Sequence, residues 1–340
     1  MTEQEESYWN GKRVLVTGAT GLVGSWLSKA LIEKGAHVVA LIRDSDPQSE
    51  LFRSGAIQSM HVVQGCLEDF ASIERAINEQ EPDTVFHLAA QAIVGVANRN
   101  PLPTLESNIR GTYHLLEACR IHRSLVKRIV IASSDKAYGT SPQLPYKEEM
   151  PPMGRHPYDV SKSCADLISQ SYFHTYRLPL VIARCGNIYG GGDLNWSRLI
   201  PSTIRALHKD QPPLIRSNGR FTRDYVFVED AVDAYLTMAE ALNRPEIRGE
   251  AFNFGPEKPL TVLEIVHAIQ KLMKKEHILP VILNQSEHEI PDQYLSSEKA
   301  LRLLKWRPHF SLEEGLAQTI AWYEAFLEEK RSSFSTFKAC

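Results

Sequence analysis

Several features are missing from this 340-residue sequence, and each absence excludes a class of protein. No apolar run approaches the roughly 18 residues of a membrane-spanning helix, and the acidic, polar start at residues 1–7 is unlike a signal peptide. The five cysteines include no CxxC pair and the 12 histidines no HExxH motif, so neither a disulfide framework nor a metal site is expected. We therefore expect a protein of the reducing cytoplasm that binds no membrane.

An excess of charge of one sign is also missing. The chain carries 38 Lys and Arg against 41 Asp and Glu, a formal net charge of −3. Such a chain has no broad basic surface of the kind that binds nucleic acid. Hydrophobic residues make up 43% and charged residues 23%, which argues against disorder and favours a globular protein with an ample core.

The first half alternates short apolar runs with helical stretches. Strands are expected at 13–17, 38–43, 61–64, 84–88, 128–133 and 180–184. Runs that are apolar throughout are typical of parallel strands covered on both faces. Helices are expected around Val23–Leu31, ended by Gly35, and at Leu105–His122 and Tyr158–Tyr176. The alternation predicts an α/β fold with a Rossmann-type doubly wound parallel sheet.

The character of the sequence changes near residue 190, where Gly, Pro and Asn become frequent. We expect a first domain at 1–189 with a returning segment at about 224–255, and a smaller C-terminal α+β lobe made mainly of 190–340. Within this part, Arg223–Val228 and Glu250–Asn253 are predicted strands. The last helix is predicted to end near Glu329, followed by a frayed tail at Arg331–Cys340.

A glycine-rich loop, TGATGLVG at 17–24, lies between the first strand and the first helix. Glycines at this spacing let the backbone turn sharply and approach a pyrophosphate, whose charge is held by the helix N-terminus. The loop therefore predicts a dinucleotide-binding site. Its contacts are expected from Gly18, Thr20, Gly21, Leu22, Val23 and Gly24.

The end of the second strand reads Ile42-Arg43-Asp44. An acidic residue here bonds the ribose 2′-hydroxyl of NAD, whereas an Arg favours the 2′-phosphate of NADP. Arg43 suits the phosphate and Asp44 the ribose, while Ile42 occupies the position where NAD enzymes often carry Asp. Both NAD and NADP therefore stay open.

Two polar groups supply candidate acid/base chemistry. Tyr158 and Lys162 are four residues apart and share one helix face. An ammonium, together with a positive nicotinamide, favours the phenolate and lowers the Tyr158 pKa, so that Tyr158 can remove a proton from a sugar hydroxyl. Ser134, Asp135 and Lys136 follow the strand at 128–133, at the strand end where α/β sheets place ligands.

Five motifs in order resemble the extended short-chain dehydrogenase/reductase family. They are TGATGLVG, HLAAQ at 87–91, SSDKAYG at 133–139, YDVSK at 158–162 and ARCGNIYGGGD at 183–193. The resemblance runs from about Gly11 to Tyr323. More narrowly, GSWLS at 24–28, the SDK triplet, GGGD and RLIP at 198–201 resemble the nucleotide-sugar 4,6-dehydratases, and among them the group acting on CDP-glucose.

The resemblance implies a role for each candidate catalytic residue. Ser134 and Tyr158 would act on the hexose 4-hydroxyl, and Lys162 would hold the cofactor ribose. Asp135 would protonate the departing 6-hydroxyl. Lys136, where most 4,6-dehydratases carry Glu, or another base would remove the C5 proton. A lysine base must be neutral when it acts, so its pKa has to be lowered by burial or nearby charge.

The resemblance also implies how two ligands are held, with residues 1–189 as the NAD(P)-binding domain and 190–340 mainly as the nucleotide-sugar-binding lobe. Further cofactor contacts are implied at Arg43, Leu67, Leu88, Ala89, Ala90, Tyr158 and Lys162, and substrate contacts at Gln91, Ser134, Asn187, Arg198 and Arg223. An Arg side chain suits a diphosphate because its planar fork bonds two oxygens. Cys66 replaces the Asp that usually bonds adenine, so main-chain groups or Glu68 would have to take over.

Three functions follow as hypotheses. The first is a nucleotide-sugar 4,6-dehydratase with a tightly bound, recycled NAD or NADP. The second is a nucleotide-sugar 4-epimerase, which needs no acid at Asp135. The third is a non-catalytic NAD(P)-binding sensor, against which the intact Ser134, Tyr158 and Lys162 count. By analogy with relatives, helices 105–122 and 158–176 would form a homodimer.

Overall fold

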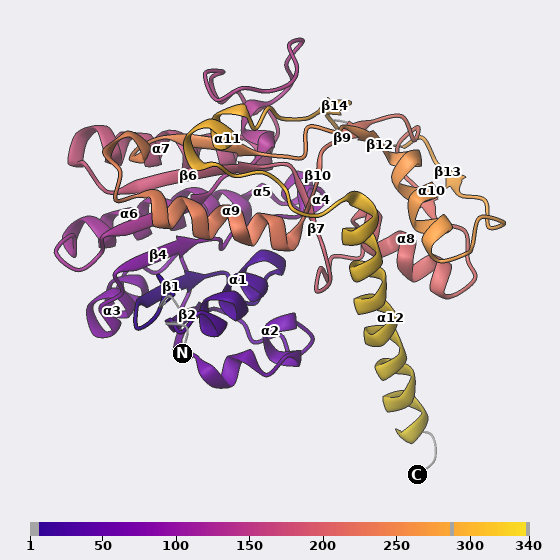
Figure 1. The fold of residues 1–340 in the computed structure, drawn as a ribbon, viewed down its shortest axis with the longest axis horizontal. Helices are drawn as coiled ribbons and strands as arrows, with labels where there is room; N and C mark the ends of the chain where they lie inside the picture. Colours follow the sequence, from indigo (N-terminus) through magenta and orange to yellow (C-terminus); the bar gives the residue numbers. More distant parts are fainter. Residues whose placement is uncertain (1–6, 286–288, 338–340) are drawn as a thin grey trace, which may run out of the picture.

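A seven-stranded parallel sheet forms the centre of the computed structural model (Figure 1). The structure describes residues 7–285 and 289–337, and of residues 330–337 only the course of the helix. The strand order is β11-β6-β5-β4-β1-β2-β3. The strands are β1 (Arg13–Thr17), β2 (His37–Ile42), β3 (His61–Gln64), β4 (Thr84–His87), β5 (Arg128–Ala132), β6 (Leu180–Cys185) and β11 (Ala251–Phe254). Every neighbouring pair is parallel, so the predicted doubly wound α/β fold is confirmed.

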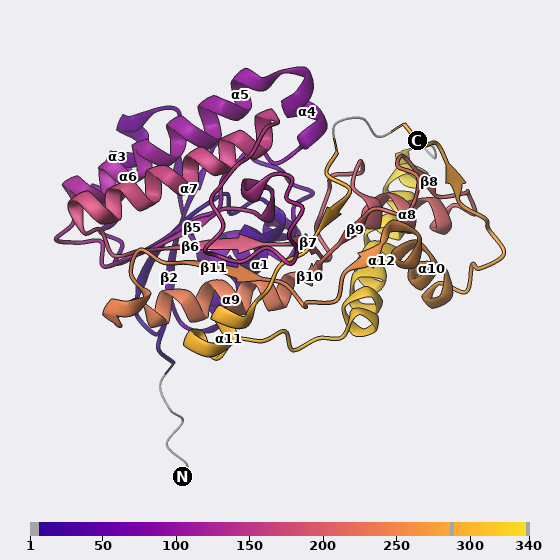
Figure 2. The same cartoon turned by 90° about the horizontal axis from the view of Figure 1, so that it is seen from above.

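Helices cover both faces of this sheet, as Figure 2 shows. On one face lie α3 (Phe70–Gln80), α6 (Gly111–Ile121) and α7 (Pro157–Tyr176), and on the other α1 (Leu22–Glu33), α9 (Val228–Ala241) and α11 (Glu298–Leu304). The apolar strands explain this layering, because successive side chains point to opposite faces. In β1, Val14 and Val16 join the core cluster of α1 and α9, whereas Leu15 joins the cluster of α3 and α6.

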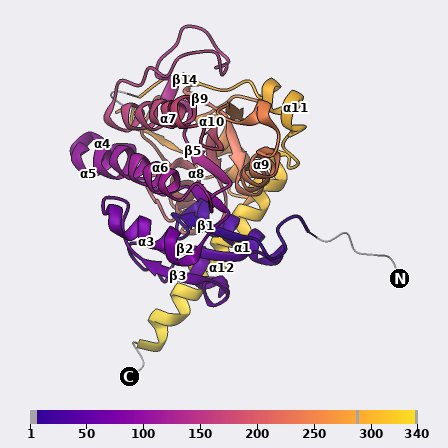
Figure 3. The same cartoon turned by 90° about the vertical axis from the view of Figure 1, so that its left-hand side faces the viewer.

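The helix predicted at Leu105–His122 is longer and interrupted. Two short helices lead into it, α4 (Val94–Arg99) and α5 (Pro101–Leu105), and a π-helical turn at Glu106–Arg110 joins α5 to α6. The wider turn carries Asn108, whose side chain is buried and bonds the loop after β4. A π-turn of this kind often marks a functional position in a helix. Figure 3 shows α4, α5, α6 and α7 gathered on the same side of the molecule.

A smaller α+β part stands beside the carboxyl edge of the sheet, at the right in Figure 1. Its short strands are β7 (Asn187–Tyr189), β8 (Leu214–Ile215), β9 (Thr222–Arg223), β10 (Tyr225–Phe227), β12 (Leu260–Thr261), β13 (Val281–Ile282) and β14 (Asp292–Gln293). Its helices are α8 (Leu199–His208), α10 (Val262–Leu272) and α12 (Leu312–Phe337). Isoleucines on one side of α8 and α10 pack against α12 and give this part its own core.

Two sequence expectations are wrong in detail. The strand predicted at Arg223–Val228 is split into β9 and β10 at Asp224, because the chain changes partners there: β9 pairs with β12 and β14, whereas β10 pairs with β7. The last helix continues to Phe337 instead of ending near Glu329, whose carboxylate lies 2.7 Å from Arg53 of α2 (Glu50–Arg53). Residues 338–340 of the predicted tail lie outside the described residues.

Among the helices of the described residues, none is both long and apolar enough to cross a bilayer. Within the same residues, no group of three or more His, Cys, Asp or Glu is arranged to hold a metal ion.

Candidate active site

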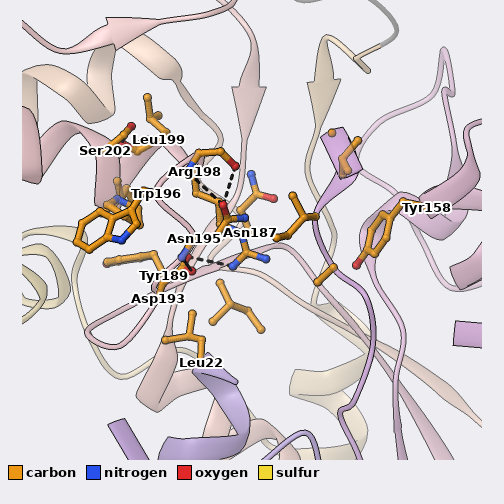
Figure 4. A pocket seen from close by; sticks show the side chains of 18 of the residues that line it. Leu22, Tyr158, Asn187, Tyr189, Asp193, Asn195, Trp196, Arg198, Leu199 and Ser202 are labelled. Carbon is orange, nitrogen blue, oxygen red and sulfur yellow. Dashed lines mark hydrogen bonds and ion pairs between the residues drawn. The ribbon is translucent and has the colours of Figure 1, made fainter. Parts of the chain in front are cut away.

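The carboxyl ends of β1, β4, β5 and β6 open into a cavity of about 1600 Å³. It lies where the strand order reverses, between β1 and β4, which is the usual ligand position in an open α/β sheet. The smaller part supplies the opposite wall, including the residues around α8 that Figure 4 labels. Pockets for one drug-sized ligand measure roughly 300–1,000 Å³. This cavity therefore has room for two ligands side by side.

The glycine loop forms one end of the cavity and has the tight geometry that a pyrophosphate needs. Gly18 adopts a φ of +74°, and a Cβ there would lie 2.7 Å from the Ala89 nitrogen. A Cβ on Gly24 would lie 2.0 Å from the Gly18 oxygen. No side chain caps α1 at Gly21, so the N–H groups of its first turn are available to an anion. The loop residues on the wall are Gly18, Thr20, Gly21, Leu22, Val23 and Gly24.

The other predicted cofactor residues divide into two groups. Arg43, Leu88 and Ala90 line the cavity, whereas Leu67 and Ala89 do not. The Leu67 side chain is instead buried against α6. A Cβ added to Gly111 of that helix would lie only 2.6 Å from the Cβ of Leu67. The backbone nitrogen of Ala89 donates to the Thr17 hydroxyl (3.2 Å), which secures the loop after β4 to the end of β1.

Arg43 and Asp44, which follow β2 and gave opposite indications for NADP and NAD, bond each other. The Arg43 Nε donates to the Asp44 carboxylate at 2.6 Å, in an exposed pair. Cys66 and Glu68 both lie within electrostatic reach of Arg43, but neither side chain is part of the cavity wall. The side chains at this end thus leave the choice between NAD and NADP as open as the sequence does.

Tyr158 and Lys162 come from the first turns of α7 and line the cavity. Figure 4 shows the Tyr158 hydroxyl turned toward the cavity and the group around Arg198. The Lys162 Nζ donates to the Ala132 carbonyl at 2.7 Å, at the end of β5. Burial lowers the pKa of Lys162 to about 8 and raises the pKa of Tyr158 to about 12. The expected lowering of the Tyr158 pKa, which counted on a nicotinamide charge as well, is not seen in the protein by itself.

Ser134 connects the tyrosine to the acid/base pair. It caps a 3-10 helix at Asp135–Tyr138, its hydroxyl bonds the Tyr158 side chain, and its Oγ donates to the Asp135 Oδ1 at 2.9 Å. Lys136 lines the cavity, whereas the Asp135 carboxyl lies just behind the wall and its Oδ2 has no hydrogen-bond partner.

Burial acts on these two ionisable groups in opposite directions. It raises the pKa of Asp135 and lowers the pKa of Lys136, because a charged form is costly away from water. The mutual attraction of the pair opposes both shifts but is the smaller effect. Asp135 is thereby favoured as an acid that carries a proton, and Lys136 as an amine that can accept one. A lysine that acts as a base needs a lowered pKa, and the pKa of Lys136 is lowered.

The predicted substrate residues occupy the far wall. Arg198 precedes α8 and bonds the Asp193 carboxylate at 3.0 Å, the ion pair drawn dashed in Figure 4. Asn187 opens β7 on the same wall, and Gln91 lies after β4. Arg223 also lines the cavity, but its terminal nitrogens already donate to main-chain carbonyls, including that of Ile290 at 2.6 Å.

Three further residues belong to this site and were missed by sequence reasoning. Asn108 accepts a hydrogen bond from the Gln91 backbone (2.8 Å) and donates to the Ser161 hydroxyl (2.9 Å), joining the loop after β4 to α7. Gln293 accepts from the Lys136 amine, and Asp193 pairs with Arg198. Asp193 lies in the GGGD motif and was within reach of the sequence. The other two depend on contacts between distant segments and had no local signal.

The site therefore brings a phenol, a hydroxyl and an amine to the wall of the cavity, with a carboxyl group just behind it, and the same cavity is lined by a glycine loop whose tight geometry suits a pyrophosphate. Such a set can take protons from a bound polyol and return them.

Comparison with known proteins supports this assignment. Residues 14–255 match the model of the NAD dependent epimerase/dehydratase family. A CDP-glucose 4,6-dehydratase of Salmonella typhimurium is 33% identical over 339 residues, covering 95% of this chain and 93% of that protein. The structure of a UDP-glucose 4-epimerase from Thermotoga maritima with UDP-glucose has a TM-score of 0.84 and 27% identity, covering 93% of this chain and 99% of that one. A dTDP-glucose 4,6-dehydratase from Streptomyces venezuelae, solved with NAD bound, has a TM-score of 0.83 and 25% identity, covering 92% and 97%.

Proposed function

The chain belongs to the NAD dependent epimerase/dehydratase family, and from that premise we propose that it is a nucleotide-sugar 4,6-dehydratase with CDP-glucose as its substrate. It would convert the hexose into a 4-keto-6-deoxy sugar with loss of one water. The observation that carries this proposal is the pair Asp135 and Lys136 beside Ser134 and Tyr158, with a raised pKa for the acid and a lowered pKa for the amine. An enzyme that only oxidises and reduces C4 has no need of that pair.

NAD fits the cavity by two features of the protein. The loop at Gly18 and Gly24 leaves no room for side chains, and the N–H groups at the start of α1 face the cavity. When bound, the cofactor would accept a hydride from C4 of the hexose and return it to C6, so that it stays bound and is recycled. Lys162, held by the Ala132 carbonyl, would bond its ribose.

The protein's own groups would move the protons. Tyr158 takes the proton of the 4-hydroxyl while Ser134 bonds the same oxygen. The C4 ketone makes the C5 proton acidic, and the Lys136 amine removes it. Asp135 gives its proton to the 6-hydroxyl, which leaves as water. For this step the Asp135 carboxyl must turn from Ser134 toward the cavity and break its hydrogen bonds from the Ser134 hydroxyl and the Lys136 backbone, while its Oδ2 has no partner to lose.

The nucleotide sugar would lie between the two parts of the chain. We propose that residues 1–189, with the returning segment at about 224–255, bind the cofactor and that 190–340 bind mainly the nucleotide sugar. Arg198 and Asn187 face the diphosphate from one side and Gln91 the hexose from the other. Arg223 would contact the substrate only through those guanidinium N–H groups that do not already donate to main-chain carbonyls. The preference for CDP-glucose is supported by the Salmonella relative and by Lys136 in place of Glu.

A 4-epimerase is the second candidate, and one observation favours it. Asp135 lies behind the wall and bonds Ser134, so of the Asp135/Lys136 pair only Lys136 reaches the cavity, beside the Ser134, Tyr158 and Lys162 that an epimerase also needs. The likeness to the Thermotoga epimerase agrees with this. A non-catalytic sensor is disfavoured, because it has no use for Ser134, Tyr158 and Lys162 together.

Product identification decides between these candidates. The purified chain would be incubated with CDP-glucose, dTDP-glucose, UDP-glucose and GDP-glucose, and each product would be weighed by mass spectrometry. A dehydratase forms a product lighter by one water. A product of unchanged mass with inverted C4 would support the epimerase, and cofactor that stays oxidised with every sugar would support the sensor.

Two further proposals accompany this function. The neighbouring helices α6 and α7 expose apolar side chains, Tyr113, Ile121, Leu167 and Tyr176, which a second copy of the chain would cover in a homodimer. Sedimentation equilibrium tests this, and a monomer would contradict it. A cytoplasmic location is proposed from the free cysteines, which suit a reducing compartment.

A further inference from the structure

A contact between distant segments reaches the proposed C5 base. The Nζ of Lys136, after β5, donates a hydrogen bond to the Oε1 of Gln293 in β14 at 2.7 Å, across 157 positions of sequence. Gln293 is completely buried, and β14 holds it in place because it pairs in parallel with β9, with Gln293 opposite Arg223. The smaller part of the chain thus holds the base that the sheet presents to the cavity.

The amide pays a structural penalty for this contact. Its oxygen must face Lys136, since an ammonium or amine donor needs an acceptor, and its Nε2 is then left buried without a hydrogen-bond partner. An unpaired buried donor is unfavourable, and native proteins keep few of them. A purely structural position would be better filled by an apolar side chain of the same size. We therefore attribute the presence of an amide at position 293 to its hydrogen bond with Lys136.

The kind of acceptor matters because Lys136 sits among charges. Four charged groups act on it: Asp135, Asp159 and Glu289 attract its proton, while Arg223 repels it. Burial outweighs these and lowers its pKa. A carboxylate in the place of Gln293 would add a direct partner for the ammonium and reverse this balance. An amide oxygen fixes the nitrogen in position without adding charge.

Accepting the proposed function, we propose that Gln293 is a positioning residue for the elimination step: its neutral acceptor fixes the Lys136 amine at the cavity wall in the form that takes the C5 proton. In that step the C5–H bond breaks and an N–H bond forms on Lys136. The electron pair expels the 6-hydroxyl, which leaves as water with the proton of Asp135. When hydride reaches C6, the ammonium returns its proton to C5.

The test compares Gln293→Glu with Gln293→Met, two replacements of similar size. The carboxylate would hold Lys136 as an ammonium, so dehydration at neutral pH should fall at least about tenfold and recover at higher pH, with the acidic limb of the kcat profile displaced upward by about one unit. The Met variant should lose a similar factor in kcat with little change in KM and no displacement. Asp292→Asn, an exposed change on the same strand, is the matched control.

Two partial reactions separate a positioning role from a structural one. Exchange of the C5 hydrogen with deuterated water should fall in both Gln293 variants, while formation of reduced cofactor from C4 should continue at the wild-type rate. Equal losses in both reactions, or a pH profile that Gln293→Glu leaves in place, would overturn the proposal. If Gln293→Glu does not fold, the exchange and oxidation rates of Gln293→Met decide by themselves. A dehydrating wild type with unaffected variants overturns only this inference, whereas a wild type that releases no water overturns the proposed function with it.

Discussion

Arg184 and Asp166 form a two-point ion pair inside the protein. The Arg184 Nε lies 2.7 Å from Asp166 Oδ2 and its Nη2 lies 2.9 Å from Oδ1, with side-chain exposures of 2% and 0%. Asp166 is one turn beyond Lys162 on α7, and Arg184 also donates to the Tyr138 hydroxyl at the end of the 3-10 helix that begins at Asp135. One guanidinium in β6 thus fixes both elements that carry the proposed catalytic groups.

Replacing Asp166 by Asn tests how much this ion pair contributes to the free energy of unfolding. The change leaves a buried guanidinium without its counter-ion, and we expect the free energy of unfolding to fall by about 3–5 kcal/mol. Urea unfolding measures it. Glu117→Gln, which breaks the half-exposed pair of Glu117 with Arg120, is the control and should cost less than about 1 kcal/mol. Equal losses in the two variants would contradict the role given to Arg184.

Replacing Asp135 by Asn separates dehydration from oxidation. The amide cannot give a proton to the 6-hydroxyl, so formation of the dehydrated product should fall by about 10²–10⁴-fold. Oxidation at C4 depends on Tyr158 and should continue. The two rates are followed by product mass and by the absorbance of reduced cofactor. Dehydration at the wild-type rate in this variant would remove Asp135 from the mechanism.

Replacing Gly24 by Ala tests the fit of the glycine loop. The added Cβ would lie 2.0 Å from the backbone oxygen of Gly18, so the start of α1 must move away from the loop. The purified variant should retain much less bound cofactor, as measured by nucleotide analysis after denaturation, and melt at a lower temperature. Gly95→Ala in α4 is the control, because its nearest neighbour is the end of the Arg99 side chain at 3.7 Å. Full cofactor retention in Gly24→Ala would show that the loop does not bind the dinucleotide.

The burial of His87 should make the protein less stable in mild acid. Burial is the main cause that lowers its pKa from 6.5 to about 3, and the charge of Lys162 adds to it. Between these two values the unfolded chain binds a proton that the folded chain does not, so stability rises with pH, by up to about 1.4 kcal/mol per unit. His87→Gln should flatten this slope between pH 4.5 and about 6.5, measured by unfolding at several pH values. A slope in His87→Gln equal to that of the wild type would contradict the assignment.

Local pattern was enough to predict the sheet and the glycine loop. Each central strand is a short apolar run, and the loop at Gly18 and Gly24 has steric demands that only one residue type meets. The predicted strands agree with the observed ones to within about one or two residues. Helix α12 runs eight residues past the predicted end at Glu329, whose carboxylate pairs with Arg53, a residue far away in the sequence.

The site was only partly visible from the sequence, for a physical reason. Ser134, Tyr158 and Lys162 follow strand ends or share a helix face, so their spacing indicates their place. The partners that hold them come from distant elements: Asn108 from a π-turn, Gln293 from β14 and Arg184 from β6. Periodicity carries no record of such contacts. The behaviour of Tyr158 was missed likewise, because its pKa is set chiefly by burial, which depends on the assembled cavity.

The cavity is shared by both parts of the chain and is large enough for a dinucleotide beside a sugar nucleotide. In the proposed reaction the sugar oxidised at C4 stays in this cavity, because the electrons withdrawn at one carbon are restored two carbons away on the same molecule. The enzyme would then draw on no external supply of reducing power, and its output would be insensitive to the redox state of the cell.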